Sequence, residues 1–300
     1  MLDEPTWRAR AAAHAARVDA FVEPHLARRR DGVKHPVHDF LFTYYSQRPA
    51  QLRRWHPGYG VALAGGDPLR GYERVVCPTP TGGSASGTRP DTVAVSRAHV
   101  AAHSTLIETI LRLLRATAHR PAQLGCFGLH EWAMVHRSDE TRHDWPLRLG
   151  PAGTDRVVES HRIACSHFDA YRFFTPTARR LNTLSPASGN RAAYEQPGCL
   201  HANMDLYKHA FRLTPMISSD LVADCFELAW HIRVLDMRAS PYDLRDLGLE
   251  PVRIETTEGK QAYAAAQRSF AEDAAPLRRR LIEECERLLL ASAGVGTRSD

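Results

Sequence analysis

The sequence predicts a mainly α (α+β) fold, in which a helical domain carries a small antiparallel β-sheet. Segments with the hydrophobic periodicity of a helix outnumber the short β-like segments. The two kinds do not alternate regularly, so a doubly wound parallel sheet is not expected. Of the 300 residues, 43% are hydrophobic and 24% are charged, which is typical of a single globular domain spanning residues 1–300.

Two helices are predicted at the start of the chain. Residues 5–30 are rich in alanine and lack glycine, so they favour a helix that ends at the turn of residues 28–32. A second helix has Pro36 in its first turn and runs to about residue 47. It ends there because Pro49 disfavours helical backbone before it.

After the two predicted helices, the sequence favours short strands and a loop. Short β-like runs separated by glycine and proline lie near residues 57–76. The segment 77–91, rich in Gly, Ser, Thr and Pro, predicts a flexible loop. A helix is expected again at 95–118. Its buried stripe is predicted to contain Val100, Leu106, Ile107, Ile110, Leu111 and Leu114.

The second half is predicted to be mostly helical. A short helix is expected at 127–137, and a second group of β segments at 147–168. Residues 168–182 predict a partial helix interrupted at Pro176. The remaining helices are expected at 201–212, at 219–238 and at 258–292, the last one broken near Pro276.

The amino-acid composition and net charge favour no single class of function strongly. The net charge is +5, and all but three of the 39 basic side chains are arginines, whose planar fork suits phosphate and carboxylate groups. A GC-rich genome also favours arginine, so this is weak evidence for nucleic acid. The six cysteines contain no CxxC pair and are expected to be reduced thiols. With no secretory or membrane-spanning pattern, we expect a cytoplasmic protein without a membrane partner.

The first candidate site segment is GLHEWAMVHR, which contains His130, Glu131 and Trp132. It does not match HExxH, because His136 follows Glu131 by five residues. If the segment is helical, Glu131 lies on a partly apolar side, where desolvation raises a carboxyl pKa as a general acid or base requires. The alternative is a helix residue that is solvated or paired with Arg137 or Arg142.

The second candidate segment is SHRIACSHFDAYRFF. In an extended chain His167 and Asp169 point to the same side, so together they can orient a water molecule. Tyr171 and Arg172 follow, and they can hold an aromatic ring or an anion. The alternative is a core strand after which Asp169 caps the next helix.

The third candidate segment is PGCLHANMDLYKHAFRL. His201, Asp205 and His209 are spaced by four residues on one helical stripe, and neighbouring pairs can chelate Fe, Zn or Mn, with His167 as a further candidate ligand. All three cannot easily share one ion, because the helical rise separates the outer two by about 12 Å. Asn203 can hydrogen-bond a polar ligand. The alternative is a half-buried polar stripe.

Several long segments carry a resemblance to a known family. They are HPVHDFLFTYYSQRPAQLRRWHPGYG, FGLHEWAMVHR, CSHFDAYRFFTPTARRLN, EQPGCLHANMDLYKHAFRL and LDMRASPYDL. From about residue 8 to residue 290 the chain resembles actinobacterial proteins commonly labelled 3-methyladenine DNA glycosylase. The resemblance implies this activity and double-stranded DNA as the partner, but no catalytic residues, because the chain lacks the Gly-rich hairpin of the helix-hairpin-helix glycosylases.

The leading hypothesis is therefore a monofunctional DNA glycosylase that excises alkylated purines without a cofactor. Such an enzyme flips the nucleotide, stacks the base on an aromatic ring and activates water with a carboxylate. The candidate catalytic residues are Glu131, Asp169, His167 and His130. The candidate substrate-binding residues are Trp132 and Tyr171 as base stacks, Asn203, and Arg148, Arg156 and Arg172 on phosphates.

Two other hypotheses remain open. One is a His/carboxylate metal-dependent enzyme, either a hydrolase or a non-haem iron oxygenase, that acts on a small molecule. The other is a nucleic-acid-binding protein without catalytic activity. Both enzyme hypotheses predict that residues 130–136, 167–172 and 201–209 converge on one pocket.

Overall fold

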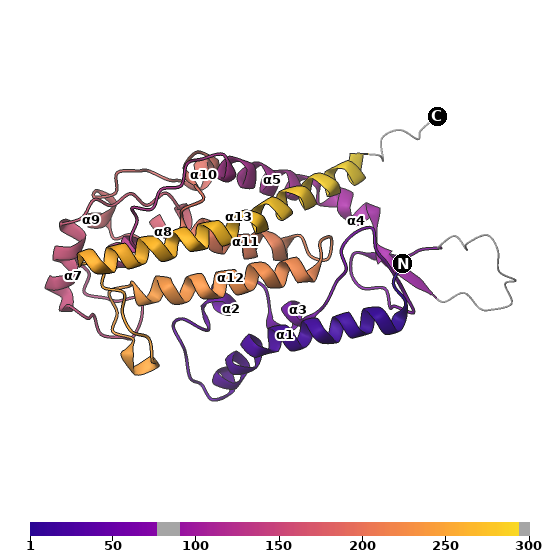
Figure 1. Cartoon of the computed structure of the whole chain (residues 1–300), viewed down its shortest axis with the longest axis horizontal. Helices are drawn as coiled ribbons and strands as arrows, with labels where there is room; N and C mark the ends of the chain where they lie inside the picture. Colours follow the sequence, from indigo (N-terminus) through magenta and orange to yellow (C-terminus); the bar gives the residue numbers. More distant parts are fainter. Residues whose placement is uncertain (77–90, 294–300) are drawn as a thin grey trace, which may run out of the picture.

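The computed structural model describes residues 1–76 and 91–293, and it confirms a mainly helical chain with a small sheet (Figure 1). The predicted loop 77–91 lies, apart from Asp91, outside the described residues. The α-helices are α1 (Glu4–Arg30), α2 (Phe40–Tyr44), α3 (Pro49–Arg53), α4 (Arg97–Ala102), α5 (Ser104–Ala118), α6 (Leu129–Ala133), α7 (Gly150–Glu159), α8 (Phe168–Tyr171), α9 (Pro176–Arg179), α10 (Arg191–Tyr194), α11 (Leu200–Arg212), α12 (Ser219–Arg238) and α13 (Thr257–Ala293).

The centre of the fold is the group of long helices α11, α12 and α13. Figure 1 shows α12 and α13 running along the length of the molecule, and α11 packs against both. Helix α5 lies against α13, and α1 lies against α12. Nine of the thirteen residues of α11 are buried, so this helix is enclosed on nearly all sides and lies inside the core.

The sheet is small and antiparallel. Its strands are β1 (Ala62–Ala64), β2 (Tyr72–Arg74) and β3 (Thr92–Val95), in the order β1-β3-β2. Ala94 of the central strand faces Ala62 on one side and Glu73 on the other. The strands near 57–76 are thus present. The prediction missed β3, whose residues adjoin and overlap the start of the helix predicted at 95–118.

The β segments predicted at 147–168 are wrong. Residues 150–159 form the helix α7, and in the rest of that range only isolated bridges occur, such as that of Ile163 with Asn182. The buried residues Thr154, Val157 and Val158 have helical spacing, so their tertiary packing outweighs the β preference of such side chains.

Three predicted helices have different bounds. The helix from Pro36 shrinks to α2, because the Asp39 carboxylate accepts from the His35 backbone N–H and holds a turn before it. The segment predicted at 95–118 begins as a strand and then divides into α4 and α5 at His103. Helix α13 continues through Pro276, which is exposed, so the carbonyl that it leaves unpaired can be solvated. The described part of the chain has no helix that is both long and apolar enough to cross a bilayer.

Helix α13 offers a matched test of the core. Leu281 is fully buried, whereas Leu290 is 78% exposed on the same helix. We expect Leu281→Ala to lower the free energy of unfolding by about 2–5 kcal/mol, because it removes buried methyl groups and leaves a cavity. Leu290→Ala should change it by less than about 0.5 kcal/mol. Urea unfolding measures both, and equal losses would contradict this packing.

Candidate functional site

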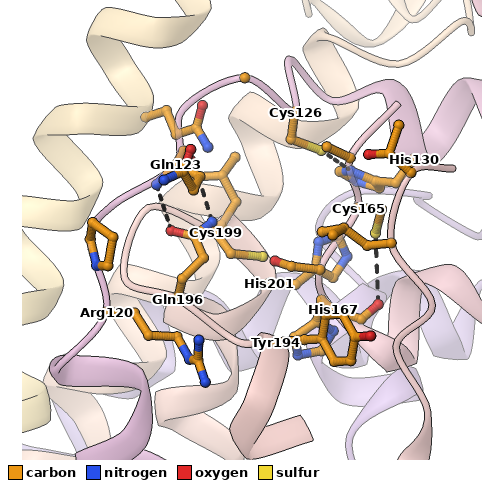
Figure 2. Close-up of a pocket in the computed structure, with 18 of the residues that line it drawn as sticks. Arg120, Gln123, Cys126, His130, Cys165, His167, Tyr194, Gln196, Cys199 and His201 are labelled. Carbon is orange, nitrogen blue, oxygen red and sulfur yellow. Dashed lines mark hydrogen bonds between the residues drawn. The ribbon is translucent and has the colours of Figure 1, made fainter. Parts of the chain in front are cut away.

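The three candidate segments meet at one cavity of about 440 Å³ (Figure 2). Helix α6 brings His130 to its wall, the segment before α8 brings His167, and the first turn of α11 brings His201. Much of the remaining wall is apolar or thiol-bearing. It includes Cys126, Cys165, Cys199, Leu184, Leu200, Tyr194 and Tyr263.

Local backbone geometry orients His130. Phe127 and Gly128 have φ angles of 48° and 72°, so the chain makes a left-handed turn immediately before α6. A Cβ on Gly128 would lie 3.3 Å from the Ala239 methyl group and from the Tyr263 ring, so glycine relieves crowding as well as allowing the turn. This turn explains why the helix predicted at 127–137 begins only at Leu129, and the positive φ of Arg137 is incompatible with helix at its predicted end.

Among the described residues, His130, His201 and Asp236 form a group of side chains that could hold a metal ion. One ligand atom of each lies within 4.8 Å of the others, and the three residues come from α6, α11 and α12. His130 Nε2 and Asp236 Oδ1 are 2.9 Å apart. Both atoms are buried, and neither has a further hydrogen-bond partner among the described residues. Each therefore depends on the other for its charge compensation.

The three side chains of this group differ in protonation state. Burial opposes ionisation of Asp236, but interaction with His130 outweighs burial and lowers the pKa of the Asp236 carboxyl. Burial and the neighbouring His130 lower the pKa of His201 to about 3, which keeps this imidazole neutral. Burial opposes protonation of His130, but the Asp236 carboxylate outweighs burial and raises the pKa of His130 well above its usual value. In the absence of a metal this imidazole therefore carries a proton, which a metal ion would displace on binding.

Further side chains contact the atoms of His130 and Asp236 that point away from each other. The Cys126 thiol lies 3.6 Å from Nδ1 of His130, the ring nitrogen that does not face Asp236. The Arg233 guanidinium donates to Asp236 Oδ2 at 3.1 Å. Contacts of this kind fix the orientation of ligating side chains in metal sites. Asp236 and Cys126 are not among the candidate residues predicted from the sequence, although Asp236 lies in the segment LDMRASPYDL and Cys126 directly precedes FGLHEWAMVHR.

A second cluster surrounds His167 and Asp205. His167 Nε2 lies 3.4 Å from Asp205 and 3.6 Å from Glu195. Asp205 also accepts from Arg191 at 2.7 Å and from the Tyr45 hydroxyl at 2.9 Å. Burial opposes ionisation of Asp205, but hydrogen bonding to His167 and nearby cations lower its pKa well below the usual range. Asp205 is thus occupied by an ion-pair network.

The metal-ligand set predicted from the α11 stripe needs correction. His201 joins His130 and Asp236, whereas Asp205 and His167 belong to the ion-pair network and His209 is buried farther along the helix. Successive turns of α11 pack against different elements, so residues on one stripe reach different clusters. Asn203 has its amide used inside the core, where it donates to Pro197 O and accepts from Arg278.

The two candidate catalytic carboxylates are both ion-paired. Glu131 accepts from the buried Arg233 at 3.0 Å, rather than from Arg137 or Arg142. Asp169 accepts from Lys208 at 2.8 Å. Burial opposes ionisation of Asp169, but the Lys208 hydrogen bond outweighs it and lowers the pKa of this carboxyl. Both line a neighbouring cavity of about 40 Å³, which has room for only a few water molecules.

Two of the predicted substrate-binding side chains are not free to bind a ligand. Trp132 is completely buried and its indole N–H donates to Ala239 O at 2.8 Å, so it belongs to the core rather than to a base stack. Arg148 makes two hydrogen bonds with the Glu255 carboxylate, at 2.9 and 3.0 Å. These positions correct the roles predicted for Trp132 and Arg148.

The other side chains predicted to bind the substrate lie nearer the protein surface. Arg156 is exposed on α7. Arg172 is also exposed; its guanidinium stacks on the Phe173 ring at 4.4 Å and lies 3.6 Å from Asp169. Tyr171 is half-buried and packs against Phe174. None of these three side chains lines the 440 Å³ cavity.

Comparisons with protein-family models, with well-described proteins and with solved structures find no match to this chain. The function is therefore inferred from the geometry of the described residues. That geometry places two imidazoles, His130 and His201, at the wall of a cavity, and the Asp236 carboxylate lies behind them, outside the described lining.

Arg233 tests the electrostatics of the site. It contacts both Glu131 and Asp236 and is itself buried. We expect Arg233→Met to lower the free energy of unfolding by about 3–5 kcal/mol, because it leaves buried carboxylates without their cation. The control is Arg245→Met, which removes an exposed arginine paired with Asp243 and should leave stability nearly unchanged. If urea unfolding gives the same result for both variants, the buried pair has no such role.

Proposed function

We propose that the protein is a metal-dependent enzyme that binds one divalent ion through His130, His201 and Asp236 and acts on a small molecule in the adjoining cavity. The observation that carries the proposal is the convergence of these three side chains, whose ligand atoms lie within 4.8 Å of one another. A divalent cation would take the place of the proton that His130 shares with Asp236 and would neutralise this buried carboxylate.

The number and type of donors support a catalytic ion over a structural one. Structural zinc sites use four protein ligands, whereas catalytic sites use three and keep a position for water or substrate. Two histidines and one carboxylate are the donor set of both catalytic zinc and non-haem iron(II) sites. His130 and His201 also line the cavity, so an ion held there is next to its contents.

The bound ion would act as a Lewis acid or activate a water or oxygen molecule, which corresponds to a hydrolase or an oxygenase. Neighbouring side chains hold the proposed ligands in position. Arg233 holds the second oxygen of Asp236, and Cys126 lies against the second nitrogen of His130. The surrounding apolar wall, including Leu200 and Tyr263, limits the access of water.

The glycosylase hypothesis has less support from the geometry. It requires a carboxylate beside a space that accepts a flipped base. Glu131 and Asp169 are held by Arg233 and Lys208, and the cavity that they share has a volume of only about 40 Å³. The Trp132 ring is inside the core.

Metal analysis tests the proposal directly. Protein purified without chelator and loaded with Zn²⁺ or Fe²⁺ should hold about one ion per chain, as measured by inductively coupled plasma mass spectrometry. We expect His201→Ala and Asp236→Asn to lower the affinity more than about 100-fold, because removing a ligand costs more than removing an outer partner. His209→Ala, on the same helix but outside the group, is the control.

The result that contradicts the proposal is equal metal content in the wild type, His201→Ala and His209→Ala. Far-ultraviolet circular dichroism shows whether each variant is folded. If His201→Ala does not fold, His201→Gln retains much of the side-chain volume and serves instead.

Release of 3-methyladenine from alkylated DNA separates the two enzyme hypotheses. We expect the wild type to release no base above a buffer control. A glycosylase would release base without metal, and Glu131→Gln or Asp169→Asn would lower the rate by roughly 10²–10⁴-fold. Base release that survives chelation and falls in these variants would contradict the metal-dependent proposal.

A further inference from the structure

The charges around the 440 Å³ cavity are unevenly distributed. Arg120 and Arg162 line it together with three histidines, and no Asp or Glu is among the described residues of its wall. Elsewhere, arginines at the surface or in the core are commonly paired, as Arg17 is with Asp224 and Glu227. In the part of the chain that the structure describes, no carboxylate lies within ion-pair distance of Arg120 or Arg162.

Arg120 is held in place but not neutralised. One of its Nη atoms donates to Ala192 O at 3.1 Å, which ties the loop after α5 to α10. Its Nε atom is buried and has no hydrogen-bond partner. Figure 2 shows Arg120 on the side of the cavity opposite Cys126 and His130. The guanidinium is therefore a positioned positive charge away from His130.

A second unpartnered polar atom belongs to Gln267. This side chain is 1% exposed and lines the cavity. Its Nε2 donates to Gly198 O, but Oε1 has no partner although it is buried. A buried acceptor without a donor is costly, so a hydroxyl or N–H group of a bound molecule would stabilise it.

We propose that the cavity binds a small organic oxyanion, whose carboxylate or phosphate group lies on Arg120 and Arg162 while a hydroxyl or N–H group donates to Gln267. The proposal rests on the metal-dependent function in one respect, since it places the reacting part of this molecule toward His130 and His201. The apolar body would pack against Leu184, Leu200 and Tyr194. A cavity of this size is typical of small-ligand sites.

Matched probes test the charge requirement. Benzoate and phenyl phosphate carry the proposed oxyanion, and benzamide has nearly the shape of benzoate without its charge. Isothermal titration of the zinc-loaded protein at constant ionic strength should show at least one of the two anions binding about ten- to a hundredfold more tightly than benzamide, because charge-assisted hydrogen bonds are worth this much. Equal binding of all three probes would overturn the proposal.

Arginine variants then locate the binding group. Arg162→Met removes a side chain with no hydrogen bond in the described residues, so the fold should tolerate it, and Arg120→Met removes the positioned guanidinium. Each should weaken anion binding about tenfold or more while leaving metal content unchanged. Arg112→Met, on the exposed side of α5, is the matched control. Anion affinities equal to that of Arg112→Met would overturn the proposal.

The two proposals fail in distinguishable ways. If the anion binds to the metal itself, His201→Ala abolishes anion binding and the arginine variants do not change it, which overturns the oxyanion site and supports the metal site. If no metal binds, the arginine-dependent preference for anions still tests the oxyanion site alone. If a DNA duplex binds in an Arg120- and Arg162-dependent manner and neither small anion does, the cavity does not hold a small oxyanion.

Discussion

The burial of Asp236 is the constraint around which the site is organised. Its side chain is completely buried on the central helix α12, where an unneutralised carboxylate would be strongly destabilising. Arg233 supplies one cation from the preceding turn and also reaches Glu131 on α6. His130 and His201 then approach the remaining oxygen from two other helices. Side chains from α6, α11 and α12 thus meet at this one carboxylate, and the left-handed turn at Phe127 and Gly128 sets the start of α6.

Successive turns of α11 contribute side chains to two different clusters. Its first turn carries His201 to the candidate metal group, and the next turn carries Asp205 into the network with His167, Arg191 and Tyr45. That network joins the segments before and after α10 to the helix core. The rings of His167 and His201 are only 5.4 Å apart, so the network borders the site without sharing its ligands. Several ion pairs and hydrogen bonds thus hold this network together, although the buried Nδ1 of His167 has no hydrogen-bond partner in the described residues.

Local sequence patterns predicted the long elements well. The helices expected at 5–30, 201–212 and 219–238 are present because these segments contain no glycine and are rich in helix-forming residues. The prediction at 147–168 failed because Val157 and Val158 favour strands locally, whereas their buried helical face is set by tertiary packing. The candidate segments were correctly placed near one another, but their partners were not. Glu131 pairs with Arg233, 102 positions away, and Asp236 lies in a helix whose sequence indicates only core packing. Spacing along one helix cannot show which distant element each turn faces.

His201 occupies the boundary between two compartments. Its ring contributes to the wall of the 440 Å³ cavity, where arginines are exposed to the contents, and to the wall of the 40 Å³ cavity, where Glu131 and Asp169 are found. A single imidazole therefore acts as a partition between a space large enough for an organic molecule and one that holds only a few waters. Any replacement of this ring by a smaller side chain would join the two spaces. Water from the larger cavity would then reach Glu131 and Asp169 through the smaller one.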